Sequence, residues 1–280
     1  FAGVVFGFDR FQRRRILTKE RNAAAIKEAN LRAQLAETEN ERKTKELEEA
    51  RQLQLSMLPK TLPQIPHLDI AVYMKTATEV GGDYYDFNVG MDGTLTVVIG
   101  DATGHGMRAG TMVTSAKSLF NSYAANPDIL FTFREMTRCI KQMQFQSLAM
   151  SMTMLKIQNN RLIMSAAGMP PVYLFRNKHK IIEEYLIEGM PLGTMDNFPY
   201  ELKEMGLFSG DTILLMSDGF PELQNANKEM FGYKRARNSF EEVAEKEPER
   251  IITYLKEAGS MWVNGKEPDD DVTFVVIKVK

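Results

Sequence analysis

The sequence contains little of what many functional classes require. It has one cysteine, Cys139, and three histidines in 280 residues. One cysteine excludes an internal disulfide framework and fits a reducing compartment, and no cysteine or histidine spacing suggests a zinc site. The formal net charge is -2, so no basic field favours a nucleic acid as partner. Metal chemistry, if present, would have to use oxygen ligands.

Proline and glycine are both absent between Thr18 and Met57, where Ala, Glu, Lys, Arg, Gln and Leu dominate. This composition predicts one long helix. A seven-residue apolar step beginning at Leu17 is not sustained, which favours a weakly specified, two-stranded signalling helix over a stable coiled coil. A solvated connector is the alternative. We predict a linker or coiled-coil-like signalling helix over residues 16–58 that pairs in a homodimer, and prolines from Pro59 onward mark a domain boundary.

The N-terminal apolar run is short and ends in basic residues. Residues 1–8 are mostly apolar, and an arginine cluster occupies residues 10–15. Eight residues cannot cross roughly 30 Å of hydrocarbon, but an apolar stretch before arginines is typical of the cytoplasmic end of a membrane helix. We therefore predict the end of a membrane helix and a basic juxtamembrane segment over residues 1–15, with an ordinary hydrophobic N-terminus as the alternative.

Residues 59–280 contain strand patterns interrupted by pairs of helical patterns. The turn Met91-Asp-Gly93 joins two of the strands in a predicted hairpin. Helices inserted between two runs of strands predict an α+β layered sandwich and argue against a parallel βαβ fold. The predicted helices cover residues 107–125, 128–144, 229–245 and 249–262. The predicted strands cover residues 68–74, 84–89, 94–99, 150–157, 161–166, 172–175, 181–186, 211–218 and 272–277.

Aspartates recur at the ends of these apolar strands. Asp83 follows a glycine pair, Asp101 and Asp218 each end a strand, and Asp270 stands just before the last strand. Carboxylates that converge repel one another unless protons or cations intervene. Oxygen ligands without histidine or thiolate suit magnesium or manganese. The aspartates therefore predict a divalent metal site, although a helix-capping role for Asp101 is the simpler alternative when that residue is taken alone.

Four ordered motifs carry a family resemblance. Each motif is weak alone, but the ordered set is specific, and it resembles the SpoIIE/RsbU branch of the PPM metal-dependent protein serine/threonine phosphatases. The resemblance covers about residues 52–280. The motifs are Glu79-Val-Gly-Gly-Asp-Tyr-Tyr-Asp-Phe87, Gly100-Asp-Ala-Thr-Gly-His-Gly106, Ser217-Asp-Gly219 and Asp270-Asp-Val-Thr273.

The resemblance implies a four-layer α-β-β-α sandwich of two antiparallel sheets, here preceded by the long signalling helix. It implies that Asp101 bridges two Mn²⁺ or Mg²⁺ ions. Asp218 and Asp270 would complete the ligands of one ion, while Asp83 and the carbonyl of Ala102 would serve the other. The implied reaction is hydrolysis of phosphoserine or phosphothreonine on a protein by direct attack of metal-bound hydroxide, without a phosphoenzyme.

Other acids near the motifs receive lesser roles. Asp271 occupies the family's neighbouring polar position and ranks below Asp270 as a ligand. Asp86, Asp92 and Asp269 are expected to be turn or surface acids.

Three further residues bear on catalysis. His105 could act as a general acid, but a helix N-terminal histidine without a catalytic role is the favoured interpretation. Arg108 is the nearest candidate for a phosphate clamp, with a solvated side chain as the equal alternative. Met169 stands where this branch commonly has the histidine of an Ala-Gly-His pattern, so a polar contact would be missing.

The resemblance also implies a protein substrate, and the predicted membrane helix implies a setting. The substrate would be a phosphorylated regulatory protein such as an anti-sigma-factor antagonist. The chain would be the cytoplasmic output domain of a bacterial protein anchored in the inner membrane and controlled by an upstream membrane sensor. A signal in the N-terminal helix would reposition the Gly81-Gly82-Asp83 loop and thereby create or remove the second metal site.

Two other functions remain open at this point. A catalytically silent signalling scaffold could keep the same fold and bind a partner. A nucleotide cyclase is the less favoured alternative: Gly81-Gly-Asp83 resembles the diguanylate cyclase hairpin, but Tyr84-Tyr85 stands in place of its Glu-Phe continuation.

Overall fold

The computed structural model describes residues 2–77 and 80–280, with side chains from Thr18 onward. The chain forms two compact units, residues 1–49 and residues 50–280. Helix α1, Ala2–Met57, runs through the first unit and contributes its last turns to the second. Side chains 18–46 are exposed throughout. The predicted long helix is therefore present, and in the second unit it ends before Pro59.

Within the described residues, no helix is both long and apolar enough to cross a membrane. The side chains of residues 1–15 lie outside the described residues, so the membrane attachment stays a prediction.

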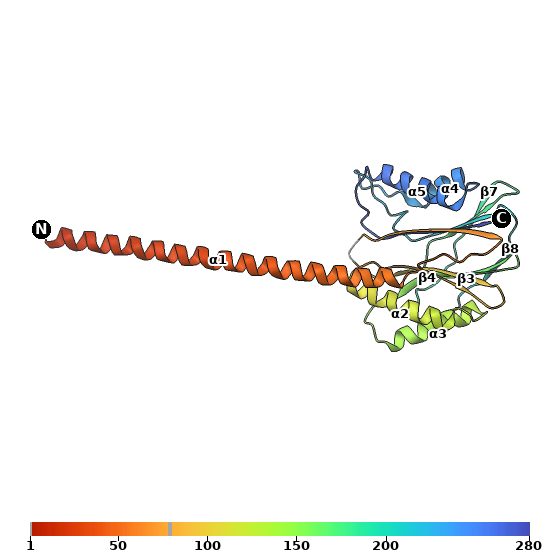
Figure 1. Ribbon diagram of the computed structural model, residues 1–280, viewed down its shortest axis with the longest axis horizontal. Helices are drawn as coiled ribbons and strands as arrows, with labels where there is room; N and C mark the ends of the chain where they lie inside the picture. Colours follow the sequence, from red (N-terminus) through yellow and green to blue (C-terminus); the bar gives the residue numbers. More distant parts are fainter. Residues whose placement is uncertain (1, 78–79) are drawn as a thin grey trace. The chain divides into compact units, whose positions relative to one another are not determined.

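In the part of the chain that the structure describes, ten strands form two five-stranded antiparallel sheets (Figure 1). Sheet A has the order β1-β10-β9-β6-β7, and sheet B has the order β2-β3-β4-β5-β8. The strands are β1 Leu68–Lys75, β2 Asp83–Val89, β3 Leu95–Ala102, β4 Met150–Gln158, β5 Arg161–Ala167, β6 Val172–Arg176, β7 Ile181–Tyr185, β8 Lys203–Gly206, β9 Thr212–Met216 and β10 Val272–Val279.

Helices cover the outer face of each sheet. Helices α2, Met107–Tyr123, and α3, Ile129–Gln142, pack on sheet B, and α4, Gly232–Val243, and α5, Pro248–Trp262, pack on sheet A (Figure 1). The α+β prediction and the α-β-β-α sandwich are confirmed.

The central strands are buried on both faces, which explains their nearly continuous apolar sequences. On β3, Leu95, Val97 and Ile99 point into the core between the sheets, while Val98 points toward the helices. The same alternation places Met150, Met152 and Met154 of β4 under α2 and α3, all fully buried. Each central strand therefore contributes to two apolar layers at once.

The sequence did not predict strand β8. It is an edge strand of four residues, Lys203–Gly206, that pairs with β5. Its residues are alternately exposed and half-buried, and they carry no apolar run. An edge strand packed on one neighbour needs little apolar surface, so the signal used for the other strands is missing.

Candidate metal centre

At one end of the sandwich, the inward-facing side chains change from apolar to polar. Inward positions recur every second residue along a strand, so the next inward position after the apolar core can be read directly from the sequence. On β2, β3, β9 and β10 the core residues at this end are Tyr85, Ile99, Leu215 and Val275. The inward positions that come next are Asp83, Asp101, Ser217 and Thr273.

The hairpin of β2 and β3 sets two of the predicted ligands opposite each other. In its register Asp83 pairs with Asp101. Gly82 precedes this pair, and a Cβ added there would lie 3.0 Å from both Asp101 Oδ1 and the carbonyl oxygen of Ala102. The backbone before β2 therefore passes close to the two groups predicted to bind metal, as the glycine pair suggested.

Asp83 is the most buried acid of this group, at 1% exposure. Its Oδ2 accepts a hydrogen bond of 2.6 Å from the hydroxyl of Thr273, which lies in the other sheet. Burial raises the pKa of Asp83 well above its ordinary value, and repulsion from Asp101 and Asp271 raises it further, against the opposing hydrogen bonds of Thr273 and Ser217. Burial and the neighbouring acids therefore both disfavour the charged form of Asp83.

Asp101, Asp218 and Asp270 perturb one another. Burial is the largest cause that raises the pKa of Asp101 to about 8, and repulsion from Asp218 and Asp270 adds to it. Burial also raises the pKa of Asp218 to about 6, with Asp270 and the exposed Glu222 contributing. The pKa of Asp270 is raised chiefly by burial, while nearby His105 lowers it. The fold thus brings these three predicted ligands into one electrostatic neighbourhood.

No lysine or arginine of the described residues pairs with these acids. None of the four predicted carboxylate ligands has a lysine or arginine in salt-bridge contact there. Over the same part of the chain, no three His, Cys, Asp or Glu side chains are already arranged to hold a metal ion. The acids are neighbours but not a preassembled cage. Their oxygen-only donors and unopposed repulsion nevertheless suit a hard divalent cation.

Asp271 has a position that the sequence did not reveal. Its carboxylate accepts backbone N–H groups from Ala77 at 2.7 Å, Gly82 at 2.6 Å and Asp83 at 3.2 Å. The residue is 5% exposed. Asp271 therefore anchors the segment that leads into β2, whereas its neighbour Asp270 is exposed and faces the other acids. The family resemblance ranked Asp271 below Asp270 as a ligand, but no local pattern indicates that Asp271 anchors this segment.

Gln54 holds the same segment from the opposite side. Its Nε2 donates to the carbonyl of Gly81 at 2.7 Å, and its Oε1 accepts from the N–H of Gly81 at 3.0 Å. Gln54 is 5% exposed, although side chains 18–46 of the same helix α1 are all exposed. A glutamine in a polar helix does not stand out in the sequence, so the role of Gln54 could not be predicted.

Asp86 is not a surface acid, so that expectation is wrong. It is 4% exposed, and its Oδ2 accepts hydrogen bonds from Lys117 at 2.5 Å and the hydroxyl of Tyr84 at 2.8 Å. Lys117 lies on α2, which covers this face of β2. A strand covered on both faces buries its polar residues too, and Asp86 is buried with a cation.

Three residues had been considered for catalytic roles, namely His105, Arg108 and Met169. His105 is exposed, and Gly104 and Gly106 beside it have φ values of 87° and 73°, which a non-glycine residue rarely adopts. Arg108 donates to the carbonyl of Gln146 at 2.8 Å. Met169 is 5% exposed and packs in the core between the sheets, so a methionine there serves packing.

Comparison with known proteins agrees with the motifs. A sequence model of the family described as Stage II sporulation protein E (SpoIIE) matches residues 91–280. The phosphoserine phosphatase RsbU of Bacillus subtilis is 25% identical over 187 residues, which cover 65% of this chain and 55% of RsbU. The chain spans about half the length of the curated relatives it matches.

Solved structures share the fold. The SiaA-PP2C domain of Pseudomonas aeruginosa matches with a TM-score of 0.75 and 19% identity, over 86% of this chain and 98% of that domain. RsbX, solved in complex with magnesium, matches with a TM-score of 0.59 and 16% identity, over 79% of this chain and 99% of RsbX. RsbU is described as a phosphoserine phosphatase, which agrees with the phosphatase interpretation.

Proposed function

The chain belongs to the SpoIIE family, and on that premise we propose that it is a metal-dependent protein serine/threonine phosphatase. The proposal is carried by one observation: Asp83 pairs with Asp101 where the core between the sheets becomes polar, Asp218 and Asp270 lie near enough to raise the pKa of Asp101, and no lysine or arginine of the described residues pairs with any of the four. Residues 91–280 match the family and contain Asp101, Asp218 and Asp270. Asp83 lies outside that match, so its inclusion rests on its pairing with Asp101.

Asp101, Asp218 and Asp270 would hold one divalent ion, and Asp83 with the carbonyl of Ala102 would hold a second one that Asp101 shares. Magnesium and manganese both suit these donors. When bound, the ions would supply Lewis acidity toward the phosphate and an activated water as nucleophile. Metal binding would be coupled to proton release, because burial and repulsion raise the pKa values of Asp101 and Asp83 and a metal ion binds the ionised carboxylate. Thr273 would keep the carboxylate of Asp83 oriented.

Replacement of Asp101 tests this function. We expect Asp101→Asn to abolish manganese-dependent hydrolysis of a phosphoserine peptide and of p-nitrophenyl phosphate. Asp269→Asn is the matched control, because Asp269 is an exposed acid next to the proposed ligand Asp270 and contacts Lys266. Retention of full activity by Asp101→Asn would reject the proposal.

A silent scaffold with the same fold is the second candidate, and one observation favours it: the acids are not preassembled within the described residues. Calorimetry separates the two functions. The phosphatase should bind manganese with proton release, measured as a dependence of the binding heat on the ionisation enthalpy of the buffer. A chain that binds no manganese at millimolar concentration would be a scaffold.

We further propose that the end of helix α1 controls Asp83. Gln54 of the helix forms hydrogen bonds with the backbone of Gly81. Asp271, just before β10, accepts hydrogen bonds from the backbone of Gly82 and Asp83. Because Gln54 bonds both the N–H and the carbonyl of Gly81, a rotation or shift of the helix end would move this backbone or break two buried hydrogen bonds. The position of Asp83, and with it the second metal site, would follow the helix.

Gln54→Leu tests whether the end of helix α1 controls the position of Asp83. It removes both hydrogen bonds at similar volume, and we expect the manganese concentration for half-maximal activity to change several-fold. Gln64→Leu, an exposed glutamine with one long contact to Leu62, is the control. Identical manganese dependence in wild type and Gln54→Leu would refute the coupling while leaving the phosphatase proposal intact.

The partners follow from the same premise. We propose a homodimer through α1, supported by the exposed apolar residues Ile26, Leu31 and Leu35 on its solvated surface. The proposed substrate is a phosphorylated regulatory protein, with an anti-sigma-factor antagonist as the first candidate. We also propose that the chain is the cytoplasmic part of a bacterial protein anchored in the inner membrane, downstream of a membrane sensor. Sedimentation equilibrium of the full chain tests the dimer, and a monomer at micromolar concentration would contradict it.

A further inference from the structure

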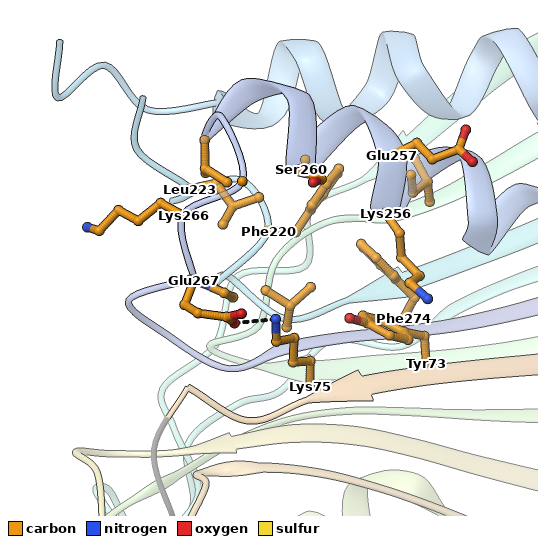
Figure 2. A pocket seen from close by; sticks show the side chains of 16 residues that line it. Tyr73, Lys75, Phe220, Leu223, Lys256, Glu257, Ser260, Lys266, Glu267 and Phe274 are labelled. Carbon is orange, nitrogen blue, oxygen red and sulfur yellow. Dashed lines mark ion pairs between the residues drawn. The ribbon is translucent and has the colours of Figure 1, made fainter. Parts of the chain in front are cut away.

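A cavity of about 370 Å³ lies between helix α5 and sheet A (Figure 2), and none of the four proposed metal ligands lines it. Its volume falls in the range of small-ligand pockets, which starts at about 300 Å³. Aromatic rings form one wall: Tyr73 stacks on Phe274 with centroids 6.0 Å apart, and Phe220 meets Phe274 edge-on at 4.8 Å. Leu223 and Leu255, both buried, extend this apolar wall. The cavity therefore offers a ligand an apolar body site.

The charges around the cavity leave one ammonium group without a carboxylate. Lys75 forms an ion pair with Glu267, and Lys266 contacts Asp269 (Figure 2 shows the first pair). Lys256 instead places its ammonium 4.4 Å from the centre of the Tyr73 ring. Within residues 2–77 and 80–280, no carboxylate lies in salt-bridge contact with Lys256.

Neighbouring groups do not neutralise Lys256 either. In Figure 2 the carboxylate of Glu257, the next residue of α5, points away from the ammonium of Lys256. The aromatic face of Tyr73 attracts a cation without neutralising it. An anionic group could therefore pair with Lys256 while its hydrocarbon part fills the cavity.

We propose that this cavity binds a small apolar carboxylate, with its hydrocarbon part in the cavity and its carboxylate at the exposed Lys256. A hydrocarbon part suits the cavity because Tyr73, Leu223 and Val263 line it. The ligand would carry a single carboxylate, because one ammonium group at the cavity, that of Lys256, has no carboxylate partner among the described residues. The inference does not depend on the phosphatase proposal, since the cavity lies outside the carboxylate cluster.

The cavity shares two chain segments with the proposed metal site. Phe220 stands two residues after Asp218, and Pro268, another lining residue, stands two residues before Asp270. The two segments touch, because a Cβ on Gly219 would lie 2.0 Å from the carbonyl oxygen of Asp271. A ligand that fills the cavity would therefore restrain the backbone on both sides of the site.

The single tryptophan of the chain provides a reporter. Trp262 Nε1 donates to the carbonyl of Leu223 at 3.1 Å, and Val263, the next residue, lines the cavity. We would titrate the full chain, with manganese present, with 4-phenylbutyrate and follow the emission of Trp262. The uncharged 4-phenylbutan-1-ol and acetate, which lacks the ring, test the two halves of the ligand separately.

We expect saturable binding of 4-phenylbutyrate, and both comparison compounds should bind at least about fivefold more weakly, as loss of one ion pair or of the apolar body requires. Lys256→Gln should weaken the binding of 4-phenylbutyrate by a similar factor. Lys234→Gln, an exposed lysine of α4 that does not line the cavity, should bind as wild type does.

A second variant keeps the test independent of charge. Ser260→Phe places a ring at an exposed lining position and should abolish binding, with circular dichroism used to show that the variant is folded. No saturable change up to about 10 mM, a range that covers even weak affinities, would overturn the site. Equal binding of the alcohol, or undiminished binding to Lys256→Gln, would overturn the assignment of a carboxylate ligand.

Discussion

Strand β9 has an aspartate at each end, and the two lie in opposite settings. Before the strand, Asp211 is 1% exposed, and its carboxylate accepts hydrogen bonds from Arg176 at 2.9 Å and from the backbone of Asn177 and Phe208 at 3.0 and 3.1 Å. Every oxygen of this buried acid has a partner, and one partner is a cation.

After the strand, Asp218 has acids as neighbours. Burial, Asp270 and Glu222 together raise its pKa to about 6. The comparison teaches that burial alone does not identify a functional acid. A buried carboxylate whose charge is matched by a cation is satisfied within the fold, whereas one surrounded by carboxylates is satisfied only by a proton or an added cation.

The largest expected effect separates the two aspartates by activity. Asp218→Asn should lower kcat/KM for a phosphopeptide on the order of 10³-fold, beyond the roughly 10–100-fold typical of residues outside the ligand shell. Because the change also removes a repulsion, the metal-free unfolding free energy should stay the same or rise. Asp211→Asn should keep most of its activity while it remains folded. Comparable losses of activity in the two folded variants would show that Asp218 and Asp211 do not differ in function.

The next effect separates them by stability. Asp211→Ala leaves Arg176, whose side chain is 12% exposed, without one of its acids and should lower the unfolding free energy by about 3 kcal/mol. Urea denaturation with EDTA measures this. The exposed Asp269→Ala should change it by less than about 0.5 kcal/mol. A loss at Asp211 no larger than at Asp269 would show that the pairing of Asp211 contributes little.

The pH dependence sharpens the comparison further. The pKa of Asp101 is about 8 in the folded protein, above its unfolded value, so the folded state binds the extra proton between those values. The metal-free stability must then fall as pH rises through this window, on the order of 2 kcal/mol more in wild type than in Asp101→Asn. Urea denaturation at pH 5 and pH 8.5 tests this, and equal slopes for both proteins would contradict it.

The smallest expected effect concerns Asp83, which has a hydrogen bond but no cation. Thr273→Val removes the hydroxyl that contacts Asp83. It should weaken the binding of the second manganese ion by about tenfold, measured by calorimetry. The control is Thr153→Val, because the buried hydroxyl of Thr153 has no hydrogen-bond partner among the described residues. Thr153→Val should bind manganese normally, and equal weakening in both variants would assign the effect to packing.

Much of the fold could be predicted from local patterns. The hairpin of β2 and β3 follows from two strand patterns and a Met-Asp-Gly turn, and its register places Asp83 opposite Asp101. Strand β8 could not be predicted, because an edge strand carries no apolar run. Asp86 was misjudged, because a local pattern does not reveal that α2 covers the outer face of β2 and supplies Lys117.

By itself, the sequence determined the alternating strands, the helical layers and the acids at strand ends, because these features depend on residues adjacent along the chain. Only the tertiary structure decided which acids lack a cation, that Asp271 anchors a loop while Asp270 faces the other acids, and that Gln54 grips Gly81. These contacts join positions far apart in the chain: Thr273 and Asp83 are separated by 190 residues. The packing of sheet A on sheet B, which no local pattern encodes, brings them together.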